Sequence, residues 1–205
     1  MSEEIPSAAE VAPAALEITP AAAGTPTRRS ASLLREIVET MLLTALIVLL
    51  VNLATGRFRI EGNSMEPNLH DSEYVLIDKI SYRLHPPERG DVIVFERPGE
   101  ERDYIKRVIG LPSDTVEVRA GQVWVNGVAL DEPYLNQNTR TDMPARIVQP
   151  DYYFVMGDNR NNSSDSRSFG AIAADVIVGR AWLVYWPPTD WSVVQHHTYA
   201  AVQNQ

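Results

Sequence analysis

The sequence predicts a mainly β fold: an antiparallel, partly barrel-like β domain that is preceded by one N-terminal apolar helix. From residue 58 onward, short runs rich in Val, Ile and aromatic residues are separated by turns of Pro, Gly, Asn and Asp. These runs do not alternate with helical segments, as βαβ units would. The pair Asn126-Gly127 between two such runs indicates a hairpin, because a type I′ turn needs positive φ at both central positions.

A single apolar stretch predicts a transmembrane helix ahead of this domain. Residues 37–54 form a run of 18 residues with one charge, Glu39, which is long enough to cross a hydrocarbon layer of about 30 Å. The alternatives are a buried core helix and a cleaved signal peptide. The first is disfavoured because the run is apolar on nearly every side, and the second because the run is long and begins well inside the chain. We therefore expect an uncleaved anchor.

The composition limits the class of protein. With 205 residues, 44% of them hydrophobic, the chain can build one medium-sized domain plus accessory segments. A net charge of −9 argues against nucleic-acid binding, which requires a clustered basic surface. The chain has no cysteine and no HExxH or comparable ligand spacing, so we expect neither a metal nor another cofactor.

These patterns divide the chain into four segments. Residues 1–33 are predicted to be a disordered tail, because their Ala, Pro, Glu and Thr residues show no sustained apolar period. Residues 34–56 are the anchor helix, and residues 57–190 are the β domain. Within that domain, residues from about 115 to 150 are expected to form a hairpin and a loop insertion. Residues 191–205 are predicted to be a C-terminal tail.

One serine is a candidate nucleophile because of its turn. Ser64 lies in the segment GNSMEPNL, ten positions after the apolar stretch ends. Gly62 allows a close approach of the backbone, and Pro67 stops a strand, so such a turn can expose a hydroxyl with backbone N–H groups aimed at the same point. A serine nucleophile needs a base. The four histidines offer little, since they lie in polar turns or in the C-terminal tail.

Lys106 is the better candidate for the base. In the segment RDYIKRVIGL, a period of two puts Lys106 on the strand face of Tyr104 and Val108, so that one of two adjacent cations can point at the core. A lysine base must be neutral, which requires burial to lower its pKa by about 2 to 3 pH units. The alternative is an edge-strand lysine that discourages aggregation.

A third segment, MGDNRNNSSDSRSFG at residues 156–170, is polar and follows an apolar strand. Such a segment is usually a solvent-facing loop, but its side chains also suit a hydrogen-bonded scaffold. Asp165 and Arg167 can form an ion pair. Ser163 can hydrogen-bond an amine and hold it in place.

These motifs together resemble a known family. An apolar helix followed in order by GNSMEPNL, RGDVIVF, YIKRVIGLPSD and GDNRNNSSDSR resembles the bacterial type I signal peptidases, which are membrane-anchored Ser/Lys proteases of the S26 family. The resemblance covers roughly residues 34–188. It implies the fold of their β catalytic domain, with Ser64 as the nucleophile and Lys106 as the general base.

The resemblance also implies supporting roles. Ser163 matches the serine that orients the lysine amine, and Asp165 with Arg167 matches a structural ion pair. Met65 and Pro67 shape the nucleophile turn.

Two positions of the turn distinguish members of the family. Some members carry a serine two residues before the nucleophile, where this chain has Gly62, so the backbone N–H of Ser64 is expected to be the main oxyanion donor. The family motif usually reads Ser-Met-x-Pro-Thr, whereas this chain has Asn68 in the place of the threonine.

The activity implied by the resemblance is cleavage of signal peptides after small-x-small sites, at the outer face of the cytoplasmic (inner) membrane. The implied partners are signal-peptide-bearing preproteins, the lipid bilayer and the protein export machinery, with no nucleic acid. The chain would span the membrane once, with its N-terminus in the cytoplasm. Basic residues around the apolar stretch favour this orientation only weakly.

Two other functions are compatible with parts of the pattern. A Ser/Lys autoprotease related to the SOS repressors would share the core fold, but no DNA-binding helix-turn-helix precedes the core here. A membrane-tethered β domain that only binds exported peptides would tolerate the loss of Ser64 and Lys106.

Overall fold

A computed structural model describes residues 27–100, 102–200 and 202. The chain divides at residue 45 into two compact units, so the N-terminal part of the long helix and the β domain are described separately.

Helix α1, Thr27–Ala54, contains the predicted anchor. Its segment Ser32–Ala54 has a mean hydropathy of 2.3 and no buried residue, and its length and composition are sufficient to cross a membrane. The helix begins earlier than predicted, so residues 27–33 of the predicted tail are helical, while residues 1–26 lie outside the described residues. It ends two residues earlier than predicted because Thr55 and Gly56 pair with β2 as the start of β1.

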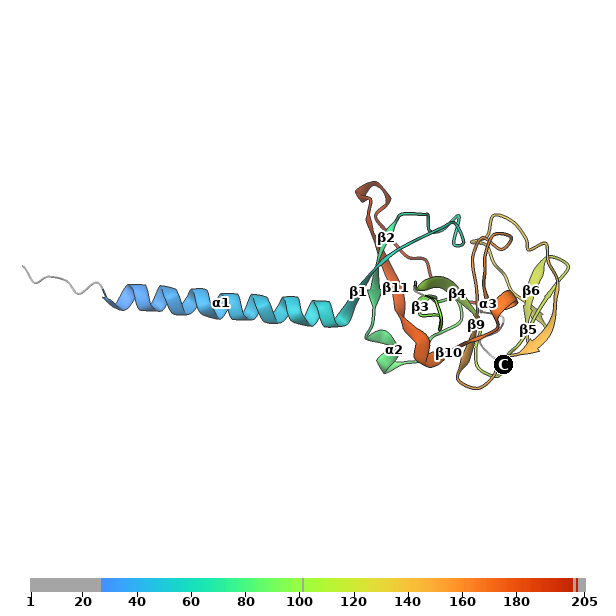
Figure 1. Cartoon of the computed structure of the whole chain (residues 1–205), viewed down its shortest axis with the longest axis horizontal. Coiled ribbons are helices and arrows are strands. Elements are labelled where there is room, and N and C mark those ends of the chain that lie inside the picture. Colours follow the sequence, from blue (N-terminus) through green and yellow to red (C-terminus); the bar gives the residue numbers. More distant parts are fainter. Residues whose placement is uncertain (1–26, 101, 201, 203–205) are drawn as a thin grey trace, which may run out of the picture. The chain divides into compact units, whose positions relative to one another are not determined.

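The β domain contains a large sheet in which every pair of strands is antiparallel, as predicted (Figure 1). The order of its strands is β1-β2-β11-β3-β4-β9-β10, and β12 pairs with β11. The strands are β1 Thr55–Arg59, β2 Tyr74–Asp78, β3 Val92–Phe95, β4 Tyr104–Gly110, β9 Tyr152–Met156, β10 Ile172–Ala173, β11 Ile177–Trp186 and β12 Ser192–Val193. Short helices α2 Ser81–Leu84 and α3 Ser166–Phe169 and 3₁₀ turns η1 Ala174–Val176 and η2 Pro188–Asp190 connect them.

A smaller sheet lies at the end of the domain away from β1 and β2 (Figure 1). It has the order β7-β6-β5-β8, with β5 Thr115–Arg119, β6 Gln122–Val125, β7 Val128–Ala129 and β8 Met143–Ile147. The predicted hairpin is confirmed, since Val125 pairs with Val128 across Asn126 and Gly127, whose φ angles are 53° and 81°. The loop insertion is not wholly a loop, because it contains β8. That strand has no alternating apolar pattern, since only Met143 is buried and the backbone makes the pairing.

Strand β4 lies at the centre of the large sheet, between β3 and β9. Apolar side chains cover both of its faces: Val108 belongs to one buried cluster, and Ile105 belongs to another. Both adjacent cations of this strand are therefore buried, Lys106 at 3% exposure and Arg107 at 1%. The sequence predicts only one buried cation, because successive side chains of a strand point to opposite faces. Here both faces are covered, so both cations are buried.

The C-terminal segment packs on the domain where the sequence predicts a tail. Val194, Tyr199 and Val202 are buried. His196 is also largely buried, and burial lowers the pKa of its imidazole to about 4. The neutral ring accepts the Val92 N–H at Nδ1 (3.1 Å) and lies 2.9 Å from the Ala181 carbonyl at Nε2. A polar sequence can thus pack against the core because its polar groups are hydrogen-bonded there.

Gly90 lies against the C-terminal segment, so substituting it tests how tightly that segment packs on the domain. Both Gly90 (φ +95°) and Gly99 (φ +88°) have a backbone that disfavours alanine, but a Cβ at Gly90 would collide with the carbonyl oxygen of His197, whereas nothing lies within 4 Å of a Cβ at Gly99. We expect Gly99→Ala to cost about 1 to 2 kcal/mol of unfolding free energy. Gly90→Ala should cost more than about 3 kcal/mol. Equal losses in denaturant titrations of the two variants would contradict the tight packing.

Candidate active site

The turn that carries Ser64 is held from inside the protein. Met65 and Leu69 are buried at 0% and 2% exposure, and they anchor the turn to the core below it. The backbone N–H groups of Asn68 and Leu69 both donate to the Met65 carbonyl, at 3.0 and 3.1 Å. Pro67 lies within the same turn. The serine therefore sits at the start of a turn that two buried side chains anchor.

Gly62 is required for its backbone conformation. Its φ of +87° disfavours any side chain, but nothing lies within 4 Å of the position of a Cβ. From the sequence we expect a close approach of another part of the backbone to be the reason for glycine here, and that reason is wrong. Its N–H donates to Asp71 Oδ1 at 2.6 Å, which fixes the start of the turn.

The loop that follows β9 holds the nucleophile turn from the other side. The Asn159 N–H donates to the Ser64 carbonyl at 2.9 Å, and Asn159 Nδ2 donates to the Asn63 carbonyl at 3.0 Å. A Cβ at Gly157 would collide with the Ser64 carbonyl oxygen and with Ser163 Oγ. Here a close approach does require glycine.

Lys106 contacts the serine directly. Its Nζ lies 2.7 Å from Ser64 Oγ and 2.7 Å from the Ile105 carbonyl oxygen. The two residues are 42 positions apart in the chain, and β4 and the nucleophile turn bring them together. No carboxylate forms an ion pair with this amine among the described residues.

The surroundings of Lys106 favour the neutral amine. Burial lowers the pKa of Lys106 from 10.5 to about 8, although the charges of Asp165 and Asp158 oppose this effect. A substantial fraction of the side chain is then neutral slightly above neutral pH, whereas only about one in a thousand exposed lysines would be. The pair has the geometry and protonation that a serine nucleophile and its base require.

Ser163 forms no hydrogen bond to either member of the pair. Its Oγ is buried and has no partner among the residues that the structure describes. The hydroxyl is near Gly157, and thus near the Ser64 carbonyl that the same glycine approaches. A buried hydroxyl without a partner is unusual and costs about 1 to 3 kcal/mol, which favours a functional reason for its position.

Asp165 and Arg167 form an ion pair. Arg167 donates from Nε and Nη2 to the two carboxylate oxygens at 2.8 and 2.7 Å, and Asp165 is fully buried. Asp165 also accepts the Gly157 N–H at 3.1 Å. The carboxylate therefore connects the loop that holds Ser64 to helix α3.

A second buried ion pair supports the nucleophile turn. Arg107 donates from Nε and Nη2 to the two oxygens of Asp158, at 2.9 and 2.7 Å. Although burial lowers it, the pKa of Arg107 is held above its ordinary value by the hydrogen bonds and the charge of Asp158. Asn68 Nδ2 donates to Asp158 at 2.8 Å and to the Tyr134 carbonyl at 3.1 Å. The asparagine that replaces the usual threonine thus connects the turn to this pair.

A third pair extends the network toward the smaller sheet. Arg160 donates from Nη1 and Nη2 to Glu132, at 2.7 and 2.6 Å. Tyr134 OH lies 2.6 Å from Tyr199 OH, so the C-terminal segment joins the same network.

A cavity of about 360 Å³ opens at Ser64 and Lys106. No acceptor takes the Ser64 N–H in the part of the chain that the structure describes, so this donor is free to bind an oxyanion. Two chain segments and the loop after β9 bound the cavity. The segments are the end of β1 with the residues after it and the start of β4 with the residues before it. Their lining residues are Phe58, Arg59 and Glu61, then Arg102, Asp103, Tyr104 and Ile105, and the loop contributes Ser164.

The structure brings Ser64 and Lys106 into contact and pairs Asp165 with Arg167. It places Ser163 near the Ser64 carbonyl without a hydrogen bond to Lys106, and it adds other residues to the site.

Arg107, Asp158 and Asn68 were not predicted to act together, since their positions span 90 residues of the chain. The only local signal of this network was the pair of adjacent cations in β4. From the sequence, only one of the two was predicted to be buried.

Comparisons with known proteins identify the family of the chain. Residues 34–186 match the family described as "Signal peptidase, peptidase S26". The signal peptidase I of Leptolyngbya laminosa is 37% identical over 175 residues, which are 81% of this chain and 85% of that protein. The signal peptidase IB of Staphylococcus aureus is 36% identical over 176 residues, 75% of this chain and 91% of that protein.

Among solved structures, a signal peptidase I from Enterococcus faecalis V583 is 37% identical, with a TM-score of 0.42, and the match covers 46% of this chain and 95% of that one. Because the family match spans most of the chain, and because relatives that are 36–37% identical match along most of their own length, the chain belongs to the signal peptidase family, peptidase S26.

Proposed function

We propose that this chain cleaves signal peptides from exported preproteins, with Ser64 as the nucleophile and Lys106 as the general base. The observation that carries the proposal is the 2.7 Å contact between Lys106 Nζ and Ser64 Oγ, made by a lysine that is buried and has no ion-pair partner among the described residues. The named relatives are signal peptidases, which supports the substrate class. The preference for small-x-small sites comes from the family resemblance.

In the first step, Ser64 Oγ attacks the carbonyl carbon of the scissile peptide bond while its proton passes to the neutral Lys106 amine. The tetrahedral oxyanion accepts a hydrogen bond from the free Ser64 N–H. The lysine ammonium then gives its proton to the departing amine, the C–N bond breaks, and the signal peptide remains as an ester on Ser64. A water molecule, deprotonated by Lys106, hydrolyses this ester and restores the serine.

Ser163 is proposed to orient the lysine amine during these transfers. A neutral amine has two N–H donors and one lone pair. When the lone pair faces the Ser64 hydroxyl, one donor reaches the Ile105 carbonyl and the other needs an acceptor. The buried, unpartnered Ser163 Oγ, which lies near the Ser64 carbonyl, is proposed to supply it.

Gly62, Met65, Pro67, Asp165 and Arg167 support this pair without reacting. The first three shape the turn that presents Ser64. The Asp165–Arg167 ion pair fixes the loop that contacts the Ser64 carbonyl, and it neutralises a carboxylate that would otherwise raise the pKa of Lys106 further.

The cavity at the pair suits an extended peptide. Its walls are the end of β1 with the residues after it and the start of β4 with the residues before it. Two such walls can hold an extended chain through backbone hydrogen bonds, as in other proteins that bind peptides beside a strand.

The placement at a membrane is part of the proposal. Helix α1 would span the cytoplasmic membrane once, with the N-terminus in the cytoplasm and the β domain outside. Ser64 follows Ala54 by ten positions, which extend at most about 35 Å, so the nucleophile would stay near the bilayer. Exposed Trp182, Trp186 and Trp191 support contact of the domain with the bilayer interface, where such side chains are favoured. Preproteins would arrive there from the export machinery.

The Ser64–Lys106 assignment is tested by removing each partner. Ser64→Ala and Lys106→Met should each lower cleavage of a purified precursor at least about 1000-fold, because each removes one half of the proton-transfer pair. Neither variant should be unfolded. At pH 7, Lys106→Met should in fact be more stable than the unmodified chain, by up to roughly 3 kcal/mol. The pKa of Lys106 is about 8 in the folded protein and 10.5 in the unfolded chain, so the buried charge costs stability below pH 8, and this cost disappears as the pH rises from 8 to 10.5.

Substantial turnover by either folded variant would refute the assignment. It would also favour the alternative of a domain that only binds exported peptides, which does not need this pair.

The pH dependence reports which group is the base. Because the pKa of Lys106 is lowered to about 8, activity should rise with pH through a midpoint near 8 and then level off. Below the midpoint kcat/KM should fall about tenfold for each pH unit. A limb near pH 6.5 would instead indicate a histidine, and it would contradict the proposed base.

Ser163→Ala tests the orienting role. The variant should lower kcat by about 10- to 100-fold with little change in KM, since the proposed role of the hydroxyl is to hold the amine and not the substrate. It should also leave the melting temperature unchanged or higher, because the buried hydroxyl has no partner to lose. Unchanged kcat at saturating substrate would show that another group orients the amine.

A further inference from the structure

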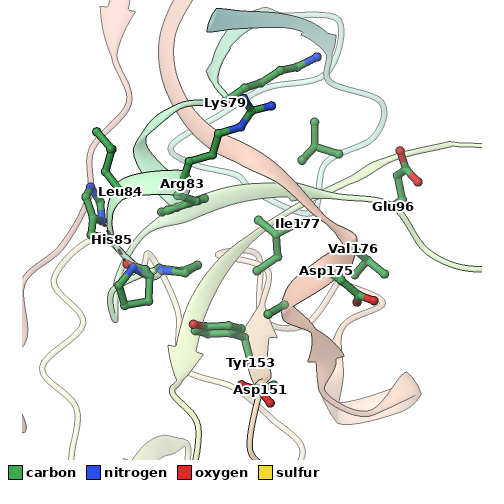
Figure 2. A pocket seen from close by; sticks show the side chains of 15 residues that line it. Lys79, Arg83, Leu84, His85, Glu96, Asp151, Tyr153, Asp175, Val176 and Ile177 are labelled. Atoms are coloured by element: carbon green, nitrogen blue, oxygen red, sulfur yellow. Dashed lines mark hydrogen bonds between the residues drawn. The ribbon is translucent and has the colours of Figure 1, made fainter.

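A second and larger cavity, of about 720 Å³, lies apart from the proposed catalytic pair (Figure 2). It shares no lining residue with the cavity at Ser64 and Lys106. Residues from helix α2, from β9 and from the start of β11 line it, and the proposed mechanism uses none of them.

Two cations lie at one end of this cavity. Figure 2 shows the charged ends of Lys79 and Arg83 on the same side, whereas Asp151 and Asp175 lie toward the opposite end. Neither cation forms an ion pair within the described part of the chain. Two cations without an ion-pair partner at one end of a cavity create a local positive potential there, which attracts an anion, although the Asp78 carboxylate caps the start of the same turn.

Lys79 is next to the end of helix α1. The Lys79 N–H donates to the carbonyl of Ala54, the last residue of the candidate span, at 3.0 Å. A Cβ at Gly56 would meet Lys79 Cε at 2.8 Å, so the lysine side chain lies over the second residue after the helix. If α1 spans the bilayer, as proposed above, Lys79 is held at the depth of the lipid headgroups.

The turn that carries the cations is also apolar on its surface. Leu84 is 81% exposed and Ile80 is 42% exposed, next to Arg83 and Lys79 respectively. Exposed aliphatic side chains beside basic ones are typical of segments that lie in a membrane interface, where the aliphatic groups enter the acyl boundary and the charges meet phosphates.

We propose that residues 79–84 contact the bilayer and that Lys79 and Arg83 bind the phosphate of an anionic phospholipid headgroup at the mouth of this cavity. Asp151 and Asp175, which lie toward the opposite end of the cavity in Figure 2, repel the phosphate and keep it at the cationic end. The inference rests on the membrane span of the proposed function and adds a lipid site that is separate from catalysis.

The test uses the full chain in detergent, titrated with phosphatidylglycerol and observed by native mass spectrometry. The double variant Lys79→Gln/Arg83→Gln should bind the lipid about 30-fold more weakly than the unmodified chain, the change expected from the loss of two basic contacts. The matched control is Arg119→Gln/Arg146→Gln, which removes the same charge from exposed positions on the smaller sheet and should bind as the unmodified chain does.

Three results would overturn the lipid site. They are an unchanged affinity in the Lys79/Arg83 variant, an equal loss in the control, or displacement of the lipid by inorganic phosphate at the lipid's own concentration, which would indicate a small-anion site. The single variant Arg83→Gln, at an exposed position, serves if the double variant is unstable.

Cleavage of a soluble peptide in detergent separates this inference from the proposed function. All of these variants should cleave as fast as the unmodified chain, because none of the four residues lies at Ser64 or Lys106. A chain that binds the lipid but cleaves nothing would refute the proposed function and leave the lipid site standing.

Discussion

The contact between the Lys106 amine and the Ser64 hydroxyl is the interaction on which the rest of this structure depends. It requires a lysine that is buried deeply enough to lose its proton near pH 8, although two carboxylates stand close by. Each of those carboxylates has its own arginine: Asp158 pairs with Arg107 and Asp165 pairs with Arg167. Because these pairs offset the negative charges locally, burial outweighs the attraction that would keep the lysine protonated.

The same two ion pairs position Ser64. Asp158 accepts a hydrogen bond from Asn68, which lies in the nucleophile turn, and Asp165 accepts one from Gly157, which touches the Ser64 carbonyl. The same carboxylates thus influence the pKa of Lys106 and hold the turn that carries Ser64. A change at either carboxylate would alter both the pKa of Lys106 and the position of Ser64, so its effects could not be assigned to one cause from activity alone.

Parts of the chain that are distant from the chemistry are needed to hold this arrangement. Arg107 Nη1 donates to the carbonyls of Gly90 and Gln195, so the C-terminal segment completes the hydrogen bonds of a buried guanidinium. Tyr199 meets Tyr134 at the edge of the smaller sheet, and Asn68 bonds to the Tyr134 backbone. The smaller sheet and the C-terminal segment therefore serve the site, although neither contributes a reacting group.

The sequence by itself determined whatever depends on local pattern. An unbroken apolar run predicts the helix, β-branched runs between turn residues predict the antiparallel strands, and Asn126-Gly127 predicts the hairpin because positive φ is a property of the dipeptide. Tertiary structure decided the contacts between distant residues. Strand β8 forms by backbone pairing without an apolar pattern, the C-terminal segment packs although its sequence is polar, and Asn68 joins Asp158 across 90 positions. Burial and hydrogen-bond partners are created only when the chain closes around Lys106, so no local pattern encodes them.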